Sequence, residues 1–177
     1  VQLITVWEHE FRERPEQIVS FITSKFGAFD QKVYARNTKF REEFDLSRVR
    51  DFMAHNHIQG RAAISRAFVL LYGEEIVGAV TYAKHHRNTG STVLNRMAFK
   101  RGIIVIGGAS RLIKNSTKEM HEEEIITWSD NRFSNGEVYS KNGFEFDADL
   151  PPDYIYFDKK GDTLRSKQSC KKSAIGC

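Results

Sequence analysis

The sequence predicts an α/β domain in which a mixed central sheet is flanked by helices. Three observations lead to this fold class. Short alternating or continuous apolar runs predict strands, apolar residues at helical spacing between them predict helices, and a glycine pair joins one strand directly to a helix. A chain of 177 residues, 40% of them hydrophobic and 28% charged, is long enough for one domain with its own core.

The first 30 residues predict one strand followed by one helix. Residues 1–7 alternate as a strand does, and Pro15 suits the first turn of a helix that ends at Gly27. Trp7 in this strand and Trp128 later in the chain are expected in the core. Because no partner strands are visible, we expect residues 1–30 to be the end of a larger unit.

The main domain is expected over residues 31–160, with elements in a definite order. The first half reads as a strand at 31–40, a helix capped by Asp45 or Ser47, a hairpin of strands 67–71 and 76–82, and a third strand at 93–99. The second half reads as a strand at 103–106, a helix to about Met120, a strand at 124–128, a helix at 134–142, and strands at 144–146 and 154–157. Residues 161–177 are rich in Lys and Ser without a core pattern, which predicts a basic mobile tail.

The glycine pair lies in residues 105–114, which read VIGGASRLIK. Two glycines let the backbone turn sharply and approach a ligand closely. The free N–H groups and dipole at the start of a helix favour an anion such as a pyrophosphate. We therefore take as candidate cofactor-binding residues Gly107, Gly108, Ala109 and Ser110. The alternative is an ordinary structural turn, since the spacing matches neither the Walker nor the Rossmann motif.

Four residues are candidates for catalysis. His57 follows a helix in a polar loop, where an ordinary pKa near ~6.5 suits a general acid or base. Asp130 follows an apolar strand at the end where α/β sheets open their crevices. Arg96 lies on a central strand and needs a partner, for which Asp130 is a candidate. Tyr139 is either a proton donor to a leaving thiolate or a core aromatic with a polar tip. For His57 and Asp130 the structural alternatives are a backbone-bonded loop histidine and a helix cap.

Basic residues occur in clusters along the chain and are not evenly distributed. Lys and Arg outnumber Asp and Glu by 27 to 23, and their clusters permit a polyanionic partner. Candidate nucleic-acid contacts are Tyr34, Arg36 and Arg132, which combine cations with an aromatic ring. A solvated surface is the alternative interpretation.

The order of elements is that of the GNAT acyltransferase fold, in which the pyrophosphate of acyl-CoA sits on the N–H groups of the turn that corresponds to 107–110. The segments NHIQG (56–60), LNR (94–96) and SDNR (129–132) resemble the phage Mom-like branch of that superfamily. The chain is most similar to the GNAT-like C-terminal half of phage proteins that begin with a Vsr-type homing endonuclease. That resemblance covers nearly the whole chain and implies that residues 1–30 are a remnant of a Vsr-like nuclease domain.

The resemblance implies transfer from acetyl-CoA or a related acyl-CoA to the exocyclic amine of adenine in DNA. It assigns catalytic positions to His57, Arg96, Asp130 and Tyr139, with Ser110 at the glycine turn. DNA is then the partner, and the cytoplasm of a phage-infected bacterium the location. Ile58 departs from the family, where an aromatic residue is usual, as does the loop that follows Asp130.

Other possibilities stay open at this point. The fold could serve as a non-catalytic DNA-binding or specificity domain of a homing endonuclease, and acetylation of a host protein is a third possibility.

No metal site is predicted, because the histidines and acidic residues do not have the usual ligand spacing. No apolar run approaches the ~20 residues that cross a bilayer, so no membrane association is expected.

Overall fold

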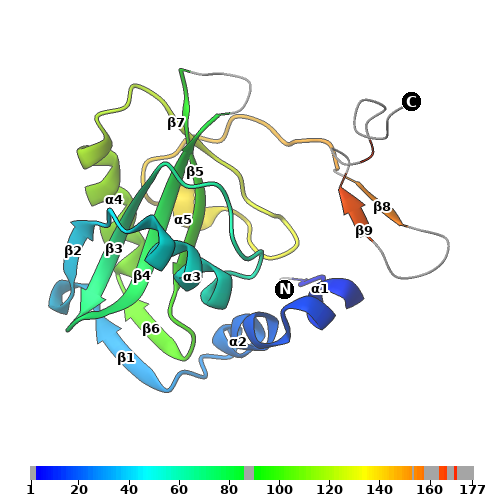
Figure 1. Ribbon diagram of the computed structural model, residues 1–177, viewed down its shortest axis with the longest axis horizontal. Helices are drawn as coiled ribbons and strands as arrows, with labels where there is room; N and C mark the ends of the chain where they lie inside the picture. The colour runs from blue at the N-terminus through cyan, green and yellow to red at the C-terminus, as the bar shows by residue number, and fades with distance from the viewer. Residues whose placement is uncertain (1–2, 86–89, 153, 158–163, 167–169, 171–177) are drawn as a thin grey trace. The chain divides into compact units, whose positions relative to one another are not determined.

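The computed structural model describes residues 3–85, 90–152, 154–157, 164–166 and 170 (Figure 1). Their contacts divide the chain into two compact units, Val1–Glu145 and Phe146–Cys177. The second unit contains β8 (Ile155–Phe157) paired antiparallel with β9 (Leu164–Ser166). The predicted mobile tail, 161–177, lies outside the described residues except for β9 and residue 170.

The first unit is built on a five-stranded mixed sheet with the order β2-β3-β4-β5-β7. Its strands are β2 (Lys39–Glu42), β3 (Arg66–Tyr72), β4 (Glu75–Lys84), β5 (Thr92–Phe99) and β7 (Ile125–Thr127). The predicted β3–β4 hairpin is confirmed. Within this sheet β5 and β7 pair in parallel as far as Leu94 and Thr127, whereas β5 stays paired antiparallel with β4 to its end at Phe99.

The prediction of one strand over residues 31–40 is wrong. The segment divides into β1 (Gln31–Tyr34), the 3₁₀ helix η1 (Ala35–Asn37) and β2. Both the backbone N–H and the hydroxyl of Thr38 donate to the carbonyl of Ala35, and these two bonds close the turn. As a result β1 leaves the main sheet and pairs in parallel with β6 (Ile103–Ile106).

Two helices cover opposite faces of the main sheet, as Figure 1 shows. The first, α3 (Leu46–Asn56), packs on the face that carries Ala67, Val69 and Ala79. The second, α4 (Gly108–Met120), packs on the face that carries Phe68, Leu70 and Val80. Successive residues of a strand point to opposite faces, so β3 and β4 supply both cores. The predicted Asp45 cap of α3 is confirmed, since its carboxylate accepts from the N–H groups of Ser47 and Arg48.

The N-terminal segment packs as part of the first unit. It forms α1 (Glu8–Glu13) and α2 (Pro15–Lys25). Ile18 is 1% exposed, and the side chain of Gln17 donates to the carbonyl of Ala54 at the end of α3. The strand predicted over residues 1–7 is wrong for the described residues 3–7, which form none.

Two further expectations are overturned. Trp7 is 55% exposed and Trp128 is 46% exposed, so neither lies in the core. Residues 144–146 form no strand, and the helix expected over 134–142 is the short α5 (Glu137–Ser140), which begins after a left-handed Gly136. Among the described residues, no helix is long and apolar enough to span a bilayer.

Candidate functional site

The glycine turn joins β6 to α4 as predicted. Gly107 has φ +76°, a left-handed conformation that favours glycine. Within the described residues, no acceptor is found for the backbone N–H groups of Gly108, Ala109 and Ser110. Since α4 has 13 residues, its dipole adds a partial positive charge to these three free donors.

Cationic side chains lie beside this turn. Arg111 donates to the carbonyl of Thr38 over 3.2 Å, and its buried Nε has no partner in the described part of the chain. The guanidinium of Arg36 lies 5.0 Å from the ring centre of Tyr34, which is aligned with Ile106 in the β1–β6 pair. The start of α4 therefore combines open amides with two arginines and an exposed aromatic ring, a setting that suits an anion.

The second glycine of the pair has a packing reason. A β-carbon on Gly108 would lie 2.5 Å from Cε1 of Phe99 and 2.9 Å from Cγ1 of Val105. Such distances are too short for real contacts, so α4 approaches β5 and β6 this closely only because residue 108 has no side chain. The turn is thus constrained by its own core as well as by any ligand.

His57 lies at the C-terminal end of α3. Its Nδ1 accepts a hydrogen bond of 3.0 Å from the backbone N–H of Gln59, so the neutral ring carries its proton on Nε2. Burial, reinforced by the charges of Arg96 and Arg14, lowers the pKa of His57 to about 3. At neutral pH this histidine is a hydrogen-bond donor through Nε2, and it is a much weaker base than an ordinary histidine.

Arg96, on β5, interacts electrostatically with both His57 and Tyr139. Its Nη1 donates to the carbonyl of Asn95 over 2.7 Å, and its buried Nε has no partner among the described residues. Burial lowers the pKa of Arg96, Tyr139 acts in the opposite direction, and Arg14 lowers it further. Tyr139 itself packs edge-to-face on Phe144, with ring centres 5.7 Å apart.

The expected pairing of Arg96 with Asp130 is wrong. Asp130 is held by Arg132, with Nη2 to Oδ2 at 2.7 Å and Nε to Oδ1 at 3.1 Å, and by the side chain of Gln59 at 3.1 Å. Although burial raises the pKa of Asp130, these hydrogen bonds hold it below its usual value. Arg132 also donates to Glu10 over 3.0 Å. It is therefore already engaged by two carboxylates.

The structure gathers the predicted residues into two groups. His57, Arg96 and Tyr139 lie together, and Gln59 links this group to Asp130. The second group surrounds the start of α4 and contains Tyr34, Arg36, Gly107, Gly108, Ala109 and Ser110. The three predicted nucleic-acid contacts are thus divided, since Arg132 belongs with Asp130.

Sequence reasoning missed Arg14 and Glu10. Arg14 precedes Pro15 at the start of α2, and a β-carbon on Gly60 would lie 3.5 Å from its Nη1. Glu10 is buried and joins α1 to Arg132. Both are charged residues that precede the predicted helix start at Pro15, and charged residues in such a position are common on protein surfaces.

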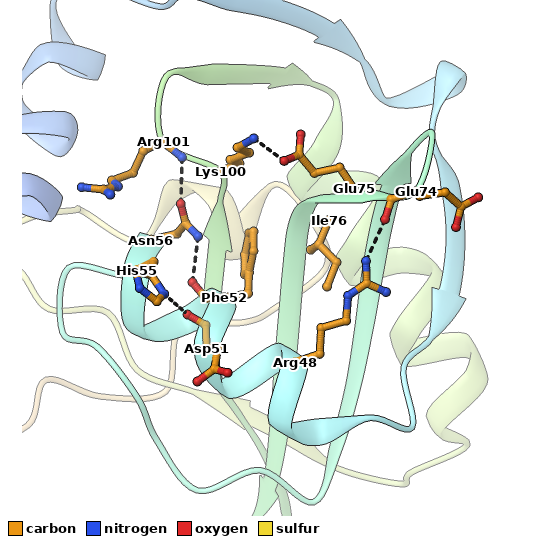
Figure 2. Close-up of a pocket in the computed structure, with 10 residues that line it drawn as sticks. All are labelled: Arg48, Asp51, Phe52, His55, Asn56, Glu74, Glu75, Ile76, Lys100 and Arg101. Carbon is orange, nitrogen blue, oxygen red and sulfur yellow. Dashed lines mark hydrogen bonds and ion pairs between the residues drawn. The ribbon is translucent and has the colours of Figure 1, made fainter.

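A separate pocket of about 770 Å³ lies between α3, the β3–β4 turn and the residues that follow β5, as its lining side chains in Figure 2 show. Its polar groups bind one another: Arg48 donates to the carbonyl of Glu74 over 2.7 Å, Lys100 pairs with Glu75, and Asn56 accepts from the N–H of Arg101. None of the predicted site residues lines this pocket.

Comparison with known proteins agrees with the fold prediction. No family model matches the chain, and no curated protein does. Two similar solved structures are of the aminoglycoside acetyltransferase meta-AAC0020 from an uncultured soil metagenomic sample. The complex with trehalose has a TM-score of 0.53 at 14% identity, and the complex with sisomicin 0.52 at 13%. Each match covers 70% of this chain and 98% of the other. The chain therefore has the mixed α/β fold of the GNAT acetyltransferases.

Proposed function

We propose that this protein is an acyl-CoA-dependent transferase that acts on a base amino group in DNA. The observation that carries the proposal is the start of α4, where three backbone N–H groups for which the described residues offer no acceptor lie beside Arg36 and Arg111. The amides of Gly108, Ala109 and Ser110 would hold the pyrophosphate, with the arginines adding charge. A bound acyl-CoA would supply an acyl group activated as a thioester.

Three side chains of the first group have distinct roles in this proposal. The phenol of Tyr139 donates a proton to the leaving sulfur, and the facing guanidinium of Arg96 stabilises the phenolate that remains. His57 donates from Nε2 and orients the acceptor. The proton lost by the amine passes to solvent, because His57 is a weak base and Asp130 is fully hydrogen-bonded.

The charge of the site favours DNA over an aminoglycoside as the acceptor. An aminoglycoside carries several ammonium groups, which Arg14 and Arg96 would repel. A polyanion is attracted by the same arginines and by the overall charge of +4. A base within a duplex would have to be flipped out, at a cost of roughly a few kcal/mol.

One observation favours a second candidate, a non-catalytic DNA-binding domain. Arg132 binds both Asp130 and Glu10, and the absence of a side chain at Gly108 has a packing reason. Both features would persist in a fold that no longer transfers an acyl group. The sequence resemblance also implied a phage origin and an association with a homing endonuclease. We keep both as part of the proposal.

Calorimetric titration with acetyl-CoA, with and without a short DNA duplex, separates the two candidates. For the transferase we expect saturable binding that Arg36→Gln weakens about 10-fold, while Lys118→Gln at the far end of α4 leaves it unchanged. Formation of acylated DNA, detected by mass spectrometry, completes the test. DNA binding without acetyl-CoA binding would instead establish the non-catalytic domain.

A further inference from the structure

Two arginines from distant parts of the chain lie close enough to His57 to interact with it electrostatically. Arg14 comes from the junction of α1 and α2, and Arg96 comes from the middle of β5. Nη1 of Arg14 lies against Gly60, whose N–H donates to the carbonyl of His57 over 2.9 Å. Both arginines depress the pKa of His57 after burial, which requires each to lie near the imidazole.

Neither guanidinium has a full complement of partners. The Nε atoms of Arg14 and Arg96 are buried, and within the described residues neither has a hydrogen-bond acceptor. Arg96 donates from Nη1 to a backbone carbonyl. Arg14 forms an ion pair with Glu13, but the pair is weak because the distance is 3.7 Å and the Glu13 side chain is 61% exposed. Buried polar groups are normally paired, and two like charges repel more strongly when partly buried.

Two other carboxylates of this part of the chain, Asp130 and Glu10, bind other groups. Asp130 accepts from Arg132 and Gln59. Glu10 accepts from Arg132 and from the backbone N–H of Trp7. Among the described residues, Arg14 has only its weak ion pair with Glu13, Arg96 has no ion pair, and the Nε–H of each remains unused.

We infer that Arg14, Arg96 and the Nε2–H of His57 form a binding site for one phosphate-type oxyanion. Guanidinium groups bind such oxyanions through paired N–H donors, and the neutral imidazole adds one more. This site involves the first group of residues and is distinct from the start of α4. That the oxyanion belongs to the acceptor, as a phosphate beside the target base, rests on the proposed function; the site itself does not.

The test is titration of the whole chain with inorganic phosphate, followed by NMR at the imidazole nitrogens of His57. We expect a saturable shift of the His57 signals. These signals are assigned by their absence from the spectrum of the His57→Gln variant. Arg14→Gln should weaken phosphate binding about 10-fold, as removal of one charge-assisted contact does. Arg101→Gln is the matched control, because Arg101 also packs on α2 through an ion pair with Glu16.

The outcomes are decisive in each direction. Failure of phosphate to shift the His57 signals up to its solubility limit, or equal weakening by Arg101→Gln and Arg14→Gln, would overturn the inference. Arg96→Lys serves as a second variant, and thermal unfolding of each variant confirms that it is folded. Acetate in place of phosphate distinguishes a carboxylate from a phosphate ligand. Arg36→Gln should leave this binding unchanged, so loss of CoA binding and loss of the oxyanion site are separable.

Discussion

The side chain of Gln59 donates a hydrogen bond of 3.1 Å to Asp130, a residue 71 positions later in the chain. The backbone N–H of the same Gln59 donates to Nδ1 of His57. One residue therefore fixes the tautomer of the histidine and occupies an oxygen of the aspartate. This relationship joins the loop after α3 to the loop after β7 and underlies the predictions for both residues.

His57 should remain neutral across the physiological pH range. Its pKa of about 3 in the folded chain, against 6.5 for an ordinary histidine, means that the unfolded chain binds a proton first as the pH falls. The contribution of His57 to stability is thus complete above about pH 6.5 and declines toward pH 3. NMR titration of the imidazole checks this, and Arg14→Gln should raise the pKa. A midpoint near 6.5 in the native protein would refute the description of the site.

Asp130→Asn should destabilise the fold by about 1–3 kcal/mol, because Arg132 loses a charged partner in a half-buried network. Asp51→Asn is the control, since Asp51 and Arg61 form an exposed ion pair that is worth at most about 1 kcal/mol. Urea unfolding of both variants gives the comparison. Equal effects would show that the Asp130 network contributes no more than a surface pair.

Gly108→Ala should cost about 1–3 kcal/mol, because the added methyl group meets the ring of Phe99. The double variant Gly108→Ala with Phe99→Leu should recover part of this loss, since a smaller side chain relieves the contact. Chemical denaturation of the two single variants and the double variant measures the coupling. Purely additive effects would mean that Gly108 is required for some other reason.

Ile18→Ala should destabilise the unit that contains the main sheet by about 2–4 kcal/mol. Ile18 is the buried residue of α2, whereas the adjacent Val19 is 49% exposed. Val19→Ala is therefore the matched control. Fluorescence and circular dichroism should follow one cooperative transition for both variants. Separate melting of an N-terminal segment would show instead that α1 and α2 are an independent element.

Tyr139→Phe should lower kcat for acyl transfer about 100-fold and leave KM nearly unchanged, because only the proton donor is removed. The ring contact with Phe144 does not depend on the hydroxyl, so stability should change little. Tyr72→Phe, at the end of β3, is the control for loss of an exposed hydroxyl. Full activity of Tyr139→Phe would remove this residue from the mechanism.

The predictions from sequence succeeded where residues close together in the chain determine the local structure. The apolar runs that became β3 and β4, the Asp45 cap and the glycine start of α4 are local patterns, and local sterics and hydrogen bonds are enough to determine them. The resulting order of elements was sufficient to predict the GNAT fold, with which the solved acetyltransferase structures agree.

The predictions failed where the local pattern allowed more than one arrangement and packing selected among them. The pattern at 31–40 suited one strand, but the Thr38 bonds to Ala35 and the pairing of β1 with β6 divide it. The sequence supplied Arg96 and Asp130 as plausible partners, yet Arg132, only two residues from Asp130, occupies that carboxylate. Charge alone cannot select among several arginines.

The sequence by itself determined the hairpin strands, the starts of α3 and α4, the fold class and the residue types available for chemistry, because these depend on periodicity and local capping. Tertiary structure alone decided that Arg14 reaches Gly60, that Gln59 joins His57 to Asp130, and that His57 is a neutral donor. These features depend on burial and on charges brought together from distant segments, and both arise only when the chain is packed.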